Sequence, residues 1–207
     1  MTDNLAFHTH SSGILFILAK QAAKRAYAAK GTLGEQYETL NAVILCAVVA
    51  EASINAMGEW FNFHHSTPPL SSSHGMPHEF ESLKLRAKWS LFPIIVRQKS
   101  FDTGSEPWQS FNALIDLRNM IVHLKGSAIP KSVSSLLKTK KLYDGSFLGF
   151  EVAKWACHTI SLMFEALTQM LELPKNWEGS IWLFTPNHSF PFGLSTPGDK
   201  VVDAQLR

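Results

Sequence analysis

One stretch of the sequence, residues 111–126, carries side chains that could do chemistry within an otherwise apolar helical pattern. An arginine can hold an anion with a planar, permanently charged fork, and a histidine can exchange a proton near neutral pH. Burying a neutral polar group without a partner costs roughly 1–3 kcal/mol, and burying a charge costs more. The polar side chains of this stretch must therefore meet a partner, a substrate or solvent. They are Asp116, Arg118, Asn119 and His123.

Four polar positions of this stretch share one side of the predicted helix, within about 60° at about 100° per residue. They are Asn112, Asp116, Asn119 and His123. Because a solvated helix face is normally wider and more charged, this narrow polar stripe predicts contact with another helix or a cleft. A purely structural interpretation stays open, in which His123 favours the helix C-terminal dipole and Asn119 hydrogen-bonds across the core.

The composition predicts one globular domain that associates with a partner subunit. The chain has 207 residues, of which 45% are hydrophobic and 17% are charged. Such a sequence offers few charges for its surface, so a partner could cover part of it. A net charge of +2 lacks the strongly basic character of proteins that wrap duplex DNA, although a local basic patch remains open.

Cysteine usage and hydropathy predict a soluble, cytoplasmic protein. Cys46 and Cys157 are the only cysteines, and both lie in apolar helix-like runs, which favours buried, reduced thiols. The longest wholly apolar run, residues 42–50, is well short of the roughly 20 residues that span a bilayer.

Apolar residues recur at every third or fourth position, which predicts an all-α protein with about five helices. Pro93 should end the third helix, and Ser105 should act as the N-cap of the fourth. The expected helices cover residues 12–30, 37–63, 79–92, 106–126 and 147–173.

The remaining segments define the predicted domain organisation. Residues 64–78, rich in Pro and Ser, should form a loop, and the connector 127–146 should contain a short helix. We expect one helical domain over residues 1–173. Residues 174–207 should form a Pro- and Gly-rich extension that packs on this domain or trails from it.

The string LRNMIVH, residues 117–123, resembles the signature of the HEPN superfamily. Arg118 is followed by a polar residue and then by His123, which makes an R-x4-H motif on the penultimate long helix. The string AEASIN on the second helix is similar to the family's glutamate and asparagine, here Glu51 and Asn55. The resemblance implies an up-and-down HEPN-like bundle, in which the helices bearing Glu51 and Arg118 should be adjacent.

The resemblance implies a metal-independent ribonuclease that acts as a homodimer, with the motif helices at the dimer axis and no cofactor. RNA would be cleaved by its own 2′-hydroxyl, with His123 as acid or base and Arg118 on the phosphate. Asn119 would orient the phosphate or the partner's imidazole. The residues expected to position this group are Glu51, Asn55 and Asp116.

Lysines follow the motif, with no acidic residue between His123 and Asp144. They could guide RNA toward the motif, or they could simply solvate a connector. They are Lys125, Lys131, Lys138, Lys140 and Lys141.

Four histidines share the predicted loop 64–78 and raise the alternative of a zinc site. The sequence offers no cysteines or paired carboxylates at a ligand spacing beside them, so we expect no metal. They are His64, His65, His74 and His78.

Two functions are consistent with these features. The first is a dimeric HEPN-type endoribonuclease, acting as a toxin or phage-defence effector with an antitoxin or another defence-system protein as partner. The second is a non-catalytic helical dimer that binds a nucleotide or a protein. An active toxin should be difficult to express, and His123→Ala should relieve its toxicity.

Overall fold

The computed structural model describes residues 2–65, 78–123, 131–142 and 148–172, and these are helical apart from short connections. The predicted all-α class is therefore confirmed for the described residues, which form six α-helices and one short 3₁₀ helix, η1. Their bounds are α1 Thr2–Ala28, α2 Leu33–His65, η1 His78–Ser82, α3 Leu85–Arg97, α4 Trp108–His123, α5 Lys131–Thr139 and α6 Phe150–Leu171.

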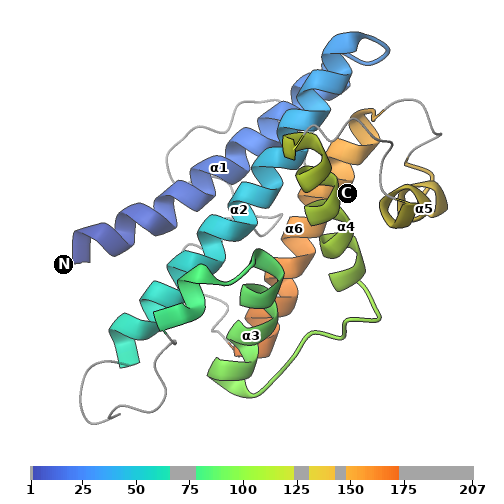
Figure 1. Ribbon diagram of the computed structural model, residues 1–207. Helices are drawn as coiled ribbons and strands as arrows, with labels where there is room; N and C mark the ends of the chain where they lie inside the picture. The colour runs from blue at the N-terminus through green and yellow to red at the C-terminus, as the bar shows by residue number, and fades with distance from the viewer. Residues whose placement is uncertain (1, 66–77, 124–130, 143–147, 173–207) are drawn as a thin grey trace.

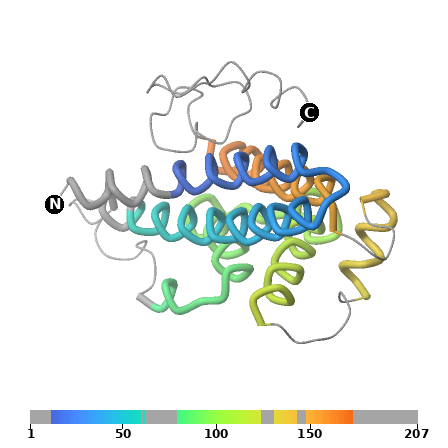
Figure 2. The backbone as a smooth tube through the Cα atoms, turned by 90° about the horizontal axis from the view of Figure 1, so that it is seen from above, coloured from blue at the N-terminus to red at the C-terminus, as the bar shows by residue number. Residues whose placement is uncertain are grey.

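The helices α1, α2 and α6 pack against one another and form the main body of the fold (Figure 1). α1 and α2 are antiparallel, and the chain turns between them at Gly31, whose φ of 80° favours glycine. Seen from above, α3 and α4 both leave this body on the same side, and α5 lies beyond α4 (Figure 2). As a result, the C-terminal end of α4 points away from α1, α2 and α6.

A single indole joins four of these helices at the centre of the hydrophobic core. Trp89 of α3 is fully buried, and its ring centroid lies 5.4 Å from that of Phe111 in α4 and 5.3 Å from that of Phe164 in α6. Its Nε1 donates a hydrogen bond of 3.1 Å to the Ala50 carbonyl of α2. This one side chain therefore sets the position of α3 and α4 relative to the main body.

A buried carboxylate fastens the turn between α1 and α2 to the start of α6. Glu35 is 5% exposed, and its Oε1 accepts a hydrogen bond of 2.7 Å from the Phe150 backbone N–H. Its Oε2 accepts another of 2.7 Å from the Gly31 N–H. A helix N-terminus has free N–H groups and a positive partial charge, so Glu35 stabilises α6 as it closes the α1–α2 turn.

The prediction that Pro93 ends the third helix is wrong. Residues 78–82 form η1, and α3 then runs from Leu85 to Arg97 with Pro93 inside it. A proline inside a helix removes one backbone hydrogen bond. Because Phe92 and Pro93 are both buried, their burial offsets this loss. The helix ends instead where Gln98 adopts a left-handed conformation with a φ of 54°.

Other predicted boundaries also shift. α1 begins at Thr2 rather than at residue 12, α2 extends beyond residues 37–63 at both ends, and α6 is shorter than 147–173. His64 and His65 belong to the end of α2. The short helix expected in the connector is confirmed as α5. The rest of the loop, residues 66–77, and the extension 174–207 lie outside the described residues.

One segment of α2, Leu33–Glu59, is long and apolar enough to span a membrane by length and composition alone. Of its most apolar window, 56% is buried within the fold. The buried central helix of a globular bundle meets the same criteria. The predicted cytoplasmic location therefore stays a prediction.

We expect Glu35→Gln to lower the free energy of unfolding by about 1–3 kcal/mol, because one buried N–H loses a charged acceptor. Chemical denaturation followed by circular dichroism measures this difference. The matched control is Glu38→Gln, which removes an ion pair to Arg25, whose side chain is 55% exposed. The control substitution should lower the free energy of unfolding by less than about 1 kcal/mol. Equal losses in the two variants would contradict the role given to Glu35.

Candidate active site on α4

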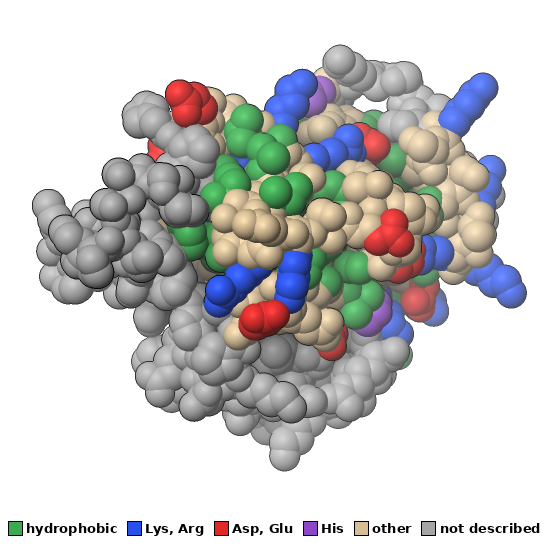
Figure 3. Space-filling view, turned by 90° about the horizontal axis from the view of Figure 1, so that it is seen from below, with side chains coloured by type: hydrophobic (Ala, Val, Ile, Leu, Met, Phe, Trp, Pro, Cys, Tyr) green, Lys and Arg blue, Asp and Glu red, His purple; other side chains and the backbone are tan. Residues whose placement is uncertain are grey.

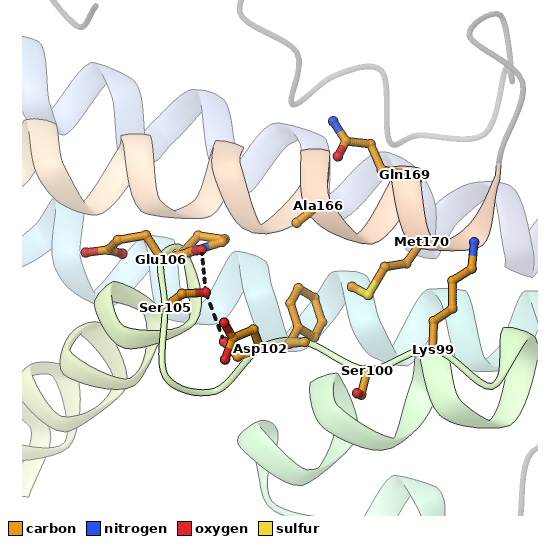
Figure 4. Close-up of a pocket in the computed structure, with 10 residues that line it drawn as sticks. Lys99, Ser100, Asp102, Ser105, Glu106, Ala166, Gln169 and Met170 are labelled. Carbon is orange, nitrogen blue, oxygen red and sulfur yellow. Dashed lines mark hydrogen bonds between the residues drawn. The ribbon is translucent and has the colours of Figure 1, made fainter.

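The start of α4 is capped by a carboxylate that sequence reasoning did not identify. Glu106 accepts hydrogen bonds from the Ser110 N–H at 3.3 Å and from the Ser110 hydroxyl at 3.0 Å. The expected N-cap, Ser105, instead turns its hydroxyl toward the carbonyls of Asp102 and Glu106 (Figure 4). The longer Glu106 side chain thus satisfies the Ser110 N–H in the first turn of this helix.

The core-facing part of α4 ends before the motif does. No described residue of α4 after Leu117 is buried. Beyond it, Met120 and Ile121 are partly buried, Val122 is 47% exposed, and His123 is exposed. Met120 and Ile121 therefore still pack against the edge of the core, whereas Val122 and His123 lie outside it.

Arg118 and Asn119, both half-buried, contact each other just before this exposed end of α4. The Arg118 Nη1 donates a hydrogen bond of 3.0 Å to the Asn119 Oδ1. The Arg118 Nε is buried, and no described atom accepts a hydrogen bond from it. His123 lies one helical turn further on, and none of the described residues hydrogen-bonds its imidazole. An exposed imidazole and a guanidinium–amide pair thus share the end of α4, where an imidazole could exchange protons and a guanidinium could hold an anion.

Another arginine contacts the polar stripe of α4. The Arg86 Nη2 of α3 lies 2.6 Å from the Asp116 Oδ1 and donates a hydrogen bond of 2.7 Å to the Asn112 carbonyl. Asp116 is therefore paired across the gap between α3 and α4. Sequence reasoning missed Arg86, because its contact with α4 depends on how α3 packs.

The expected contacts of Glu51 and Asn55 with the motif are absent among the described residues. α2 and α4 do pack together, so the predicted adjacency of their helices is confirmed. Glu51, however, is exposed. Asn55 accepts a hydrogen bond of 2.8 Å from the Lys88 Nζ of α3, and Lys88 is only 3% exposed. Asn55 thus satisfies a buried lysine, and neither side chain reaches Arg118.

Lys140, just after α5, lies away from His123. The Lys140 Nζ is 2.6 Å from the Glu106 Oε1, at the opposite end of α4. Lys138 and Lys141 are close to it in sequence and are exposed. Basic side chains protrude on this side of the molecule, while hydrophobic and acidic groups interrupt the rest of the visible face (Figure 3). Lys125 lies outside the described residues.

Burial alone would raise the pKa of Glu106, but the hydrogen bonds from Lys140 and Ser110 outweigh it and hold this pKa below its ordinary value. The Lys140 charge is thereby partly committed to Glu106. Of the α5 lysines, Lys131 at the helix start lies nearest to His123 along the chain.

A pocket of about 330 Å³ lies between the loop before α4 and the end of α6 (Figure 4). Met170 and Phe101 contribute apolar surface to it, and Lys99 and Asp102 contribute charge. It contains none of the motif residues. Because it borders the N-terminal end of α4, the length of that helix separates it from His123.

The described residues contain no group of three or more His, Cys, Asp or Glu side chains able to hold a metal ion. The proposed zinc ligands His64, His65, His74 and His78 have side chains outside the described set.

Cys46 and Cys157 are buried and free, with sulfur atoms 3.8 Å apart. Burial raises the pKa of the Cys46 thiol, and its contact with Cys157 raises it further.

Comparison of the chain with family models, with curated proteins and with solved structures finds no match. The site is therefore interpreted from its own residues and from the resemblance of its motif.

The ion pair between Glu106 and Lys140 should make a pH-dependent contribution to stability. A lowered carboxyl pKa stabilises the folded state above the ordinary value of 4.5, and this contribution disappears as the pH falls through the folded-state pKa. Because the Glu106 side chain is 44% exposed, we expect less than about 1 kcal/mol.

Urea denaturation of the parent chain and of Glu106→Gln should show a larger difference at neutral pH than well below pH 4.5. In a Lys140→Met background this pH-dependent difference should shrink. A difference that grows on acidification would be incompatible with the pair as described.

Proposed function

We propose that this protein is a metal-independent RNA endonuclease of the HEPN type, acting as a toxin or phage-defence effector. The observation that carries the proposal is the end of α4. There His123 is exposed and Arg118 is half-buried, with its Nη1 bonded to Asn119. The exposed imidazole is accessible to a polymeric substrate, which a fully buried polar stripe would not be.

The proposed reaction is attack of an RNA 2′-hydroxyl on the adjacent phosphorus. A bond forms from the 2′-oxygen to phosphorus, and the bond from phosphorus to the 5′-oxygen breaks. One proton leaves the 2′-hydroxyl and another reaches the 5′-oxygen, so an imidazole, which can accept one proton and donate another, suits both transfers. His123 supplies the imidazole. Arg118 stabilises the negative charge of the pentacoordinate phosphorus. Asn119, which already accepts a hydrogen bond from Arg118, orients the guanidinium.

A homodimer completes this arrangement. One chain supplies one motif histidine, whereas two proton transfers are served more easily by two groups near one phosphate. A two-fold axis beside the end of α4 brings both copies together. Met120, Ile121 and Val122 give this end an apolar surface that the single chain leaves partly open, and a second copy would cover it.

The cellular setting follows from the same proposal. A ribonuclease that acts on host or phage RNA works in the cytoplasm, and it needs a partner, such as an antitoxin or another defence-system protein, to restrain or trigger it. The competing function is a non-catalytic dimer that binds a nucleotide or a protein. Cleavage assays separate the two.

The purified protein should cleave single-stranded RNA in the presence of EDTA and leave a 2′,3′-cyclic phosphate. The nucleophile is the substrate's own hydroxyl, so a 2′-deoxy residue at the cut site should stop the reaction. Mass spectrometry of the fragments identifies the terminus. Loss of cleavage on chelation would indicate a metal mechanism instead.

Within this assay, His123→Ala should lower the rate roughly 10²- to 10⁴-fold if His123 is the acid or base. The matched control is His158→Ala, which removes an exposed histidine of α6. Circular dichroism should show both variants folded. A folded His123→Ala protein that cleaves RNA as fast as His158→Ala would refute the catalytic assignment and favour the non-catalytic dimer.

The proposed dimer predicts that Val122→Asp separates the subunits and lowers activity per chain, because a carboxylate would enter an apolar interface. Analytical ultracentrifugation measures the association, and dilution of the parent chain should reproduce the loss. Ile14→Asp is the control, since Ile14 is 56% exposed on α1. A parent chain that is monomeric and fully active at every dilution would exclude the composite site.

A further inference from the structure

Arg86 lies on the same face of α4 as His123. The side chains of Asn112, Asp116 and His123 fall within one narrow wedge of the helix, and Arg86 contacts the first two of these residues. Arg118, by contrast, projects roughly 160° away from Asp116 around the helix and reaches this face only through its hydrogen bond to Asn119. In the single chain, Arg86 is therefore a cation held directly on the polar stripe.

Arg86 also lies within reach of a strand bound at His123. Asp116 precedes His123 by two helical turns, which is about 10 Å along the axis. Lys140, in contrast, lies at the far end of α4 against Glu106. The side chains of Arg86 and Asp116 are each 39% exposed, so a phosphate in solution can approach the guanidinium.

We propose that Arg86 binds a backbone phosphate of RNA next to the scissile one, and that Asp116 occupies its guanidinium when RNA is absent. This inference rests on the proposed ribonuclease function and adds a substrate contact from α3. The Nη2 of Arg86 is committed to Asp116 and to the Asn112 carbonyl, while no described residue accepts a hydrogen bond from its Nη1. A guanidinium can hold a phosphate in a two-pronged contact, so the phosphate displaces the carboxylate.

A structural role for the pair makes the opposite prediction. If Arg86 only fastened α3 to α4, removal of either partner would loosen α4 and weaken RNA binding. If Asp116 instead competes with phosphate for Arg86, the two substitutions act in opposite directions. Arg86→Gln weakens binding, and Asp116→Asn strengthens it.

The experiment measures fluorescence anisotropy of a short, labelled single-stranded RNA with every 2′-hydroxyl methylated, which the enzyme cannot cleave. Arg86→Gln should weaken binding on the order of tenfold. It should also reduce the slope of log affinity against log salt by about 0.7, the effect of one lost contact to a single-stranded phosphate. Arg86→Lys keeps the positive charge but loses the planar guanidinium. Its affinity for the RNA should therefore fall between those of the parent chain and Arg86→Gln. Arg97→Gln, which removes a charge from the other end of the same helix, should bind like the parent chain.

Asp116→Asn should bind the RNA several-fold more tightly, and this gain should vanish in the Arg86→Gln background. If Asp116→Asn still tightens binding in the Arg86→Gln background, Asp116 acts by simple charge repulsion. That result would overturn the proposed competition between Asp116 and phosphate for Arg86. Equal binding by Arg86→Gln and Arg97→Gln, with RNA cleavage intact, would overturn the inference and leave the proposed function standing. A parent chain that neither binds nor cleaves RNA would overturn both. Thermal melts of each variant identify losses that come from unfolding.

Discussion

The placement of the candidate site depends on the burial of one indole. Trp89 reaches from α3 to α2 through its hydrogen bond and to α4 and α6 through ring contacts. An aromatic ring enclosed in this way contributes a large part of the local packing energy and fixes the helices that touch it. The contact with Phe111 orients α4 about two turns before Arg118. The direction in which the motif leaves the core is therefore set at Trp89.

The polar groups on α4 are satisfied in two different ways. Asp116 is compensated within the chain, by Arg86 from the neighbouring helix. Arg118 and Asn119 partly satisfy each other, and His123 is exposed to solvent. Within the polar stripe, Asp116 is therefore paired with Arg86 of α3, whereas His123 at the helix end is exposed to solvent. The proposed chemistry belongs to this exposed end.

The sequence predicts the helical class and the order of the helices, because apolar spacing survives in any environment that buries one face. It fails where a tertiary contact decides. Pro93 stays inside α3 because its burial outweighs the lost hydrogen bond, and Glu106 caps α4 because its longer side chain reaches Ser110. The pairing of Asn55 with Lys88, like the position of Arg86 beside the stripe, depends on how α3 packs. No local spacing encodes that packing.

The exposure of His123 at the end of α4 has a genetic consequence. Its substitution removes little that the single chain needs for folding, so a variant inactive at this position would accumulate to normal levels. If the proposed dimer forms, such a chain would still pair with an active one and contribute a defective half to the shared site. Inactivating alleles at this position would then be dominant over the active allele, whereas alleles that disrupt the Trp89 core would be recessive.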